Sequence, residues 1–411
     1  MKVTLVSYGS DGDVRPMVAL GEGLRAAGHE AVLVGDIGGA ALAQAHDLEF
    51  HAFAGSVRDE MEGGFGGTMD AGRFTLRAIV EFRLPHAAWH TTIAKAARGS
   101  DAVLCLPLAT YHAASAADEV GAVPILVNLQ PMLPTREFAP SGLGVVGAPR
   151  VANHLIGRLV DAGGWGLYGG GLNKARRTLG LGRLRNPYSA DPLLGAWSPT
   201  LVPLPSDWDA FRVTVTGDWP LPAASAWEPD ADLRAFLESG EPPIYVGFGS
   251  MMGVAGLPAI VDAALAAFAG RRVLLHGGWA GVAARDLPTN VHALGFAPHD
   301  WLFPQCAAIV HHCGAGTTHT AARSGTPSIP VPLLLDQPFW ADRLHRLGIA
   351  SRPLNRRHPS VAAFADAFAE VDRPEVRARA SEIAARMRRE DGVAKAVAVI
   401  ERLVSGRSSD G

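Results

Sequence analysis

One segment of the chain carries residue types that suit an anionic ligand. Residues 311–318 read HHCGAGTT and stand where the apolar stretch 308–311 gives way to a helical pattern. Glycines let the backbone approach a ligand, and the free N–H groups at the start of a helix favour an anion. His312, Thr317 and Thr318 add side-chain donors. The segment predicts a phosphate or diphosphate site, with a tight turn, a capped helix and a packed histidine as the plain alternative.

Other ligand classes fit this segment less well. It lacks the Gly-Lys-Ser/Thr ending of a P-loop, and the strand–helix turns lack the G-x-G-x-x-G fingerprint, which disfavours a NAD-dependent dehydrogenase. His311 and His312 are adjacent, but their spacing to Cys313 and His319 matches no recognised metal-ligand set. We therefore expect no metal at this site.

Short buried strands that alternate with helices must position these groups. Residues 3–8 form a largely apolar run that predicts a parallel strand, and Pro16 suits the first turn of the helix that follows. Residues 244–248 start a second series, in which Gly249-Ser250 echoes Gly9-Ser10. The pattern predicts an α/β protein with two doubly wound parallel sheets. The other expected strands are 31–34, 102–106, 125–128, 272–275, 308–311 and 328–331, with a helix at 113–119 and terminal helices within 361–404.

Composition divides the chain into segments. Proline and tryptophan residues gather between 201 and 243, which indicates a linker. We expect domains at 1–205 and 243–385, a linker at 206–242 and a terminal helical segment at 386–411. Two aperiodic stretches rich in glycine, 55–72 and 131–171, predict irregular functional loops.

The composition of the whole chain disfavours several classes of protein. The 411 residues are 48% hydrophobic and 19% charged, with a net charge of −3, which excludes a wholly disordered chain and disfavours a nucleic-acid binder. Three cysteines are too few for a disulfide framework. No apolar run reaches the ~18 residues of a membrane span, and no secretory signal is visible. We expect a soluble, cytoplasmic protein.

Two separated motifs resemble a known enzyme family. Residues 9–16, GSDGDVRP, are similar to the opening of the bacterial antibiotic (vancomycin-type) glycosyltransferases and of the sterol glucosyltransferases. The resemblance implies the GT-B fold, in which two Rossmann-like domains face a cleft. It also implies that the first domain binds the acceptor, that the second binds the donor, and that the terminal helix packs back on the first domain. The second motif resembles the donor signature of nucleotide-sugar-dependent glycosyltransferases and comprises residues 312–318, 325–327 (GTP), 331–332 (VP), 336–337 (DQ) and 340–341 (WA).

The resemblance also implies a role for individual donor-site residues. Residues 296–299, FAPH, occupy the place of Trp-Ala-Pro-Gln in the plant enzymes, so Phe296 would stack on the nucleobase, with Ala297 beside it. Asp336 and Gln337 would bind hydroxyls of the transferred sugar. The cosubstrate would be a nucleotide-sugar, with no further cofactor and no required metal. The residues expected at the donor diphosphate are Ser10, Ser250, His312, Gly314, Gly316 and Thr317.

Asp13 is the candidate for the chemistry, because many relatives have a histidine there that deprotonates the acceptor. A free aspartate has a pKa near ~3.9, so it is ionised and ready as a base at neutral pH. A helix cap is the alternative role for Asp13. Thr320 aligns with a glutamate that grips the ribose in plant enzymes, and this departure leaves both UDP- and dTDP-sugars open.

These assignments predict an inverting O-glycosyltransferase that acts on a small hydrophobic, natural-product-like acceptor. The alternatives are a sugar-nucleotide 2-epimerase of the same fold, a C-glycosyltransferase and a non-catalytic partner of a glycosyltransferase. We expect a monomer or a homodimer that binds no nucleic acid and does not span a membrane. The candidate acceptor-binding residues are Phe65, His86, Trp89, Met132 and Phe138.

Overall fold

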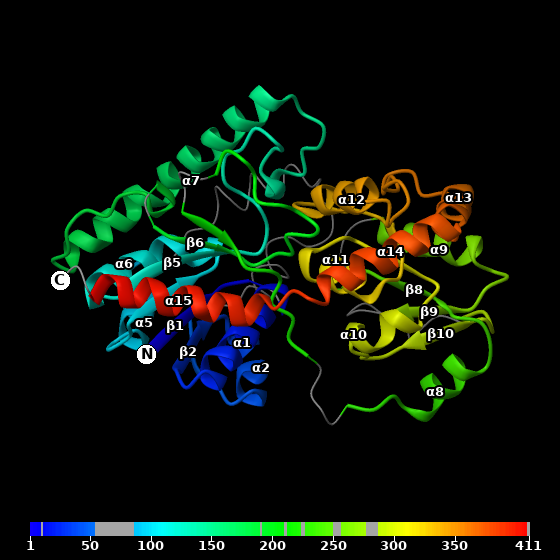
Figure 1. Cartoon of the computed structure of the whole chain (residues 1–411), viewed down its shortest axis with the longest axis horizontal. Helices are drawn as coiled ribbons and strands as arrows, with labels where there is room; N and C mark the ends of the chain where they lie inside the picture. Colours follow the sequence, from blue (N-terminus) through cyan, green and yellow to red (C-terminus); the bar gives the residue numbers. More distant parts are fainter. Residues whose placement is uncertain are drawn as a thin grey trace.

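The computed structural model describes residues 1–9, 11–53, 86–189, 191–208, 212–222, 227–249, 256–276 and 287–408. Within them, two parallel sheets lie next to each other, and helices pack on the sheets (Figure 1). The strand order is β3-β2-β1-β4-β5-β6-β7 in the first sheet and β10-β9-β8-β11-β12 in the second. The predicted α/β class with two doubly wound domains is confirmed.

The first sheet consists of short strands that are mostly buried. In β1 (Lys2–Ser7), Val3 and Leu5 face one buried cluster and Val6 faces another, so helices cover both sides of the strand. This explains why the strand is almost continuously apolar. The remaining strands are β2 (Glu30–Gly35), β3 (Glu49–Ala52), β4 (Ala102–Cys105), β5 (Val123–Asn128), β6 (Leu193–Gly195) and β7 (Val213–Val215). The helices of this domain are α1 (Asp11–Ala26), α2 (Ala40–Ala45), α5 (His86–Ala96), α6 (Thr110–Val120) and α7 (Arg150–Thr178).

The second sheet carries the donor motif at the carboxyl end of one of its central strands. Its strands are β8 (Ile244–Gly247), β9 (Val273–His276), β10 (Val291–Leu294), β11 (Ala308–His311) and β12 (Ser328–Pro330). Helices α8 (Ala231–Glu238), α9 (Leu257–Ala267), α10 (His299–Leu302), α11 (Ala315–Ser324), α12 (Gln337–Arg346), α13 (Val361–Val371), α14 (Pro374–Met387) and α15 (Gly392–Ser408) complete the chain.

The structure corrects three details of the predicted elements. Helix α1 begins at Asp11, so Pro16 lies in its second turn and cannot donate to the carbonyl of Gly12. Residues 150–178, expected as part of an irregular loop, form the 29-residue helix α7. Its seven glycines hide the helical pattern, because glycine is a poor helix former and gives no apolar periodicity. The segment 206–242, expected as a linker, contributes β7 to the first sheet and contains α8.

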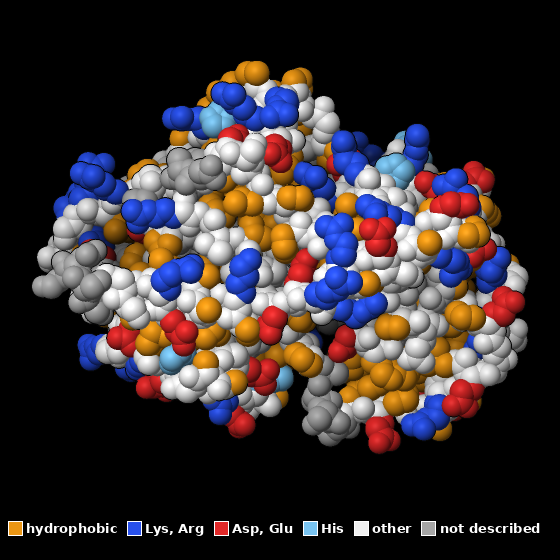
Figure 2. All heavy atoms as spheres, viewed as in Figure 1, with side chains coloured by type: hydrophobic (Ala, Val, Ile, Leu, Met, Phe, Trp, Pro, Cys, Tyr) orange, Lys and Arg blue, Asp and Glu red, His pale blue; other side chains and the backbone are white. Residues whose placement is uncertain are grey.

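The last helix of the chain returns to the first domain. Helix α15 packs on α1, and a β-carbon at Gly23 would overlap Val393. Figure 2 shows Lys and Arg side chains gathered near the junction of the two domains. The described part of the chain contains no helix that is long and apolar enough to cross a membrane. The domain limits at 205, 242 and 385 stay predictions. The buried apolar side chains of α15 in the first-domain core are Ala396, Val397, Val399 and Ile400.

Candidate active site

Asp13 lies at the carboxyl end of the first sheet. Strand β1 ends at Ser7, and α1 begins at Asp11, which puts the half-buried Asp13 in the first turn of the helix. A β-carbon at Gly9 would overlap the Asp13 carboxylate, so only glycine lets this carboxylate lie against the backbone. The turn therefore presents a carboxylate at the edge where ligands bind in doubly wound sheets.

Two glycine turns meet at the corresponding edge of the second sheet. Strands β8 and β11 are neighbours, and a β-carbon at Gly249 would lie 3.6 Å from Cε1 of His312. A β-carbon at Gly314 would lie 2.6 Å from Nε2 of the same ring, so glycine is required there. Cys313 adopts a positive φ of 66°, an uncommon conformation for a residue other than glycine. Ser10 and Ser250, both expected at the diphosphate, lie outside the described residues.

The N-terminus of α11 directly follows these glycines. Gly314 is the N-cap, and the first N–H groups of a helix have no partner within it, so Gly316 and Thr317 can offer theirs to an anion. Gly316 is exposed and Thr317 half-buried. His312, Gly314, Gly316 and Thr317 therefore form one continuous turn that could hold a diphosphate.

Burial keeps the histidines of this site neutral. It lowers the pKa of His312 to about 4 and the pKa values of His299 and His311 to about 3. His312 is thus uncharged near pH 7 in this state and would donate to a phosphate as a neutral imidazole. His311 accepts from the N–H of Cys313 through Nδ1 at 3.2 Å, so it supports the turn itself. The described residues contain no group of three or more potential metal ligands.

Asp336 and Gln337 stand at the start of α12. The side-chain oxygen of Gln337 accepts from the N–H groups of Leu333 and Leu334, at 2.8 and 2.9 Å, so its amide nitrogen is the atom left for a sugar hydroxyl. Trp340 donates from Nε1 to Oδ2 of Asp336 at 3.0 Å. Burial, together with the nearby charge of Asp13, raises the pKa of Asp336 to about 6.

The loop after β10 exposes an aromatic ring. The Phe296 side chain is 74% exposed, whereas Ala297 is buried. His299, the last residue of the FAPH segment, stacks on Phe303 and lies 3.1 Å from the hydroxyl of Tyr245. Only Phe296 of these residues offers a free flat face to a nucleobase.

Two of the candidate acceptor residues, Trp89 and Phe138, are buried in the structure. Trp89 is 1% exposed and stacks on Phe53, so its packing in the first domain accounts for it without an acceptor. Phe138 is buried too, against Phe339 and Arg343 of α12. Met132 and His86 are half-buried. Nδ1 of His86 lies 2.9 Å from Nε2 of His112. Phe65 lies outside the described residues.

Comparison with known proteins places these features in a family. Residues 263–403 match the family model described as "Erythromycin biosynthesis protein CIII-like, C-terminal domain". The chain is 34% identical to O-mycaminosyltylonolide 6-deoxyallosyltransferase of Streptomyces fradiae, over 100% of this chain and 99% of that one. It is 32% identical to vancomycin aglycone glucosyltransferase of Amycolatopsis orientalis, over 98% of both chains.

Solved structures give the same fold. The glycosyltransferase of kitacinnamycin aligns with a TM-score of 0.74 over 98% of this chain and 99% of that one, at 22% identity. Glycosyltransferase VinC, solved in complex with dTDP, aligns with a TM-score of 0.67 over 98% of this chain and 100% of that one, at 21% identity.

The two Rossmann-like domains have the GT-B fold of these solved structures, and the relatives identify the chain as a glycosyltransferase. The chain belongs to the family of antibiotic and other natural-product glycosyltransferases that contains the vancomycin-type enzymes and has sterol glucosyltransferases as homologues. The resemblance carried by residues 9–16 and 312–341 is thereby confirmed.

Proposed function

We propose that this glycosyltransferase moves a sugar from a UDP- or dTDP-sugar to a hydroxyl of a hydrophobic natural-product acceptor, with inversion at the anomeric carbon. Asp13 is the general base, and the reaction needs no metal. The donor occupies the second domain, and the acceptor enters from the first.

One observation carries this proposal. Asp13 belongs to the first domain and Asp336 to the second, yet the charge of Asp13 raises the pKa of Asp336. Such an effect requires the two carboxylates to lie within range of each other's charge, and the two domains do meet beside Asp336, since a β-carbon on Gly144 would lie 2.9 Å from the carbonyl oxygen of Leu335. A sugar held by Asp336 would have its anomeric carbon near an acceptor oxygen held by Asp13, which is the arrangement that direct transfer needs.

The chemical step follows from these positions. Asp13 takes the proton of the acceptor hydroxyl as its oxygen forms a bond to the anomeric carbon. The bond from that carbon to the diphosphate oxygen breaks on the opposite face, which inverts the configuration. The N-terminus of α11, with His312 and Thr317, stabilises the negative charge that develops on the departing diphosphate.

The site and the relatives together support particular classes of donor and acceptor. The exposed ring of Phe296 supports a stacked nucleobase, and the dTDP complex of VinC supports a dTDP-sugar as one possible donor. Two relatives are named for O-mycaminosyltylonolide and for the vancomycin aglycone, which supports a natural-product acceptor. A cytoplasmic location and a monomeric or homodimeric state stay predictions.

The test is an acceptor screen by mass spectrometry, with UDP-glucose and dTDP-glucose as donors. The expected result is a product heavier by one hexose, whose anomeric configuration in a proton NMR spectrum is opposite to that of the donor. Conversion of the donor without any acceptor would support an epimerase instead, and a product that resists acid hydrolysis would indicate a C-glycoside.

A further inference from the structure

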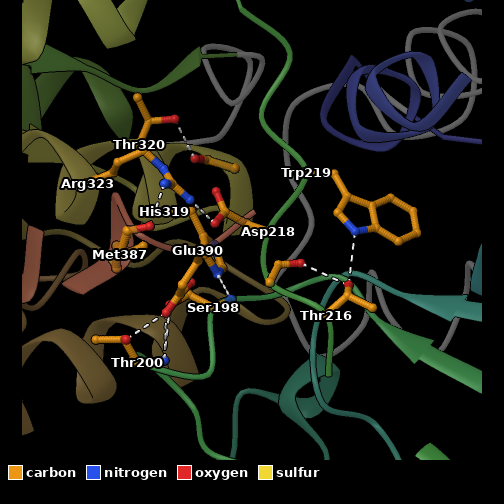
Figure 3. Close-up of polar contacts among 12 residues, drawn as sticks. Ser198, Thr200, Thr216, Asp218, Trp219, His319, Thr320, Arg323, Met387 and Glu390 are labelled. Atoms are coloured by element: carbon orange, nitrogen blue, oxygen red, sulfur yellow. Dashed lines mark hydrogen bonds and ion pairs between the residues drawn. The ribbon is translucent and has the colours of Figure 1, made fainter. Parts of the chain in front are cut away.

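Helix α11, which carries the diphosphate turn at its start, is fastened to the first domain along one face. His319 and Arg323 are four residues apart and therefore share that face. Arg323 forms an ion pair with Asp218 and donates to the carbonyl of Met387 at 2.7 Å. Figure 3 shows these contacts where the chain passes between the domains.

His319 joins the diphosphate turn to the first domain through its two ring nitrogens. Nδ1 lies 2.7 Å from the carbonyl of Ala315, in the first turn of α11, and a carbonyl can only accept, so Nδ1 carries the proton. Nε2 accepts from the backbone N–H of Ser198 at 3.1 Å. The ring is neutral in this arrangement and is only 4% exposed.

The same ring also reaches the sugar subsite. The indole of Trp340 packs edge-to-face on His319, with 4.9 Å between the ring centroids, and Trp340 holds the carboxylate of Asp336. One side chain therefore touches the diphosphate turn, the support of the sugar carboxylate and the first domain.

Ser198, the hydrogen-bond partner of His319, is itself held in place by Glu390. Glu390, in the crossing before α15, accepts through Oε1 from the hydroxyls of Ser198 and Thr200, at 3.0 and 2.6 Å. At the same crossing, a β-carbon on Gly217 would lie 3.0 Å from the α-carbon of Gly392, so the two chain crossings touch. Ser198 is thus part of the crossing rather than of a free loop.

We propose that His319 is a positioning residue for the donor: its hydrogen bond to Ser198 sets the diphosphate turn and the sugar carboxylate relative to the acceptor domain. This deepens the donor site and rests on the proposed function. The coupling has a physical cause, because loss of the imidazole leaves a buried N–H of Ser198 without its acceptor and removes the support of Ala315 and Trp340 together.

Three substitutions of His319 distinguish its hydrogen bond to Ala315 from its hydrogen bond to Ser198. His319→Ala removes both hydrogen bonds. His319→Gln has the reach of Nε2 and can accept from Ser198, whereas His319→Asn has the reach of Nδ1 and can only donate to Ala315. Ser324→Ala, on the same helix, is the matched control, because its hydroxyl donates to the carbonyl of Ala321 and accepts from the N–H of Thr326 at the end of α11, away from Ala315, Ser198 and Trp340.

The readouts are steady-state kinetics, binding of UDP and dTDP by calorimetry, and hydrogen exchange of the peptide that contains Ser198. For His319→Ala we expect kcat/KM for the donor to fall about 10-fold or more, with a raised donor KM, an acceptor KM within about twofold of wild type and faster exchange at Ser198. His319→Gln should recover most of the loss, His319→Asn should not, and Ser324→Ala should match wild type.

Unchanged donor KM in His319→Ala, or equal recovery by Asn and Gln, would overturn the inference. If the alanine variant does not fold, the Gln–Asn difference still decides it. A wild-type protein that binds neither UDP nor dTDP would instead overturn the proposed donor site, and the inference with it, so the two failures are distinguishable.

Discussion

The charge of Asp13 acts on Asp336 across the two domains, and Asp13→Asn tests this directly. The asparagine keeps the shape of the side chain but removes the charge. Burial is the larger cause of the raised pKa of Asp336, and Asp13 is the smaller one. The pKa of Asp336 should therefore fall in the variant but stay above its ordinary value of 3.8.

The contribution of Asp336 to the free energy of unfolding follows from its raised pKa. A rise from 3.8 to about 6 corresponds to at most about 3 kcal/mol of disfavoured ionisation in the folded state. Because the pKa is higher in the folded protein, the contribution to stability is complete below about pH 4 and is lost as the pH rises to about 6. Asp13→Asn should make stability depend less steeply on pH within this window.

The assay is carbon NMR of protein labelled at the aspartate carboxyl carbons, with Asp336→Asn used to assign the signal. Urea unfolding at pH 4, 5 and 6 measures the stability term in parallel. Asp342→Asn, whose carboxylate pairs with Arg346 on the same helix, is the control and should leave the Asp336 titration unchanged. An unchanged or higher pKa of Asp336 in Asp13→Asn would show that the two carboxylates are not neighbours, and the proposed arrangement of base and sugar would fail.

Three further variants test single residues. His312→Ala should weaken UDP or dTDP binding by about 1.5–3 kcal/mol in calorimetry, because it removes a charge-assisted hydrogen bond; unchanged affinity and turnover would refute its role. Phe296→Ala should lower nucleotide affinity by about 1–3 kcal/mol while leaving the free energy of unfolding within about 0.5 kcal/mol, since the ring is exposed; the reverse pattern would mean that the ring is structural. Trp89→Ala should destabilise the fold by about 3–5 kcal/mol in urea, because the ring is buried; a stable variant with altered acceptor choice would restore the acceptor role.

Local chemistry explains why much of the fold could be predicted from the sequence. Buried parallel strands are short apolar runs, so the expected strand at 308–311 coincides with β11, and the one at 31–34 lies within β2. The glycine-rich turn before α11 could also be predicted, because its glycines, histidine and threonines are consecutive, whereas its diphosphate role stays a prediction. Helix α7 was missed because its glycines interrupt the apolar period, and its buried positions include Arg176, which a periodicity argument would place outside.

Contacts between distant segments lie beyond what the sequence pattern can predict. From the sequence, His319 could be considered only as a potential metal ligand. No sequence pattern predicts its hydrogen bond to Ser198, which is 121 residues away. The neighbouring charges of Asp13 and Asp336 depend on how the two sheets meet. Trp89 was a candidate acceptor-binding residue, yet its ring packs on Tyr8 and Phe53.

The central claim is that Asp13 is the base, and the most direct measurement is turnover of Asp13→Asn on an aliphatic alcohol acceptor. Donor affinity and melting temperature are measured on the same preparation, so that loss of folded protein is not mistaken for loss of chemistry. If Asp13 is the base, the rate should be about 10²–10⁴-fold lower, with donor binding nearly intact. If the folded variant keeps more than about a tenth of the wild-type rate, well above that loss, Asp13 is not the base.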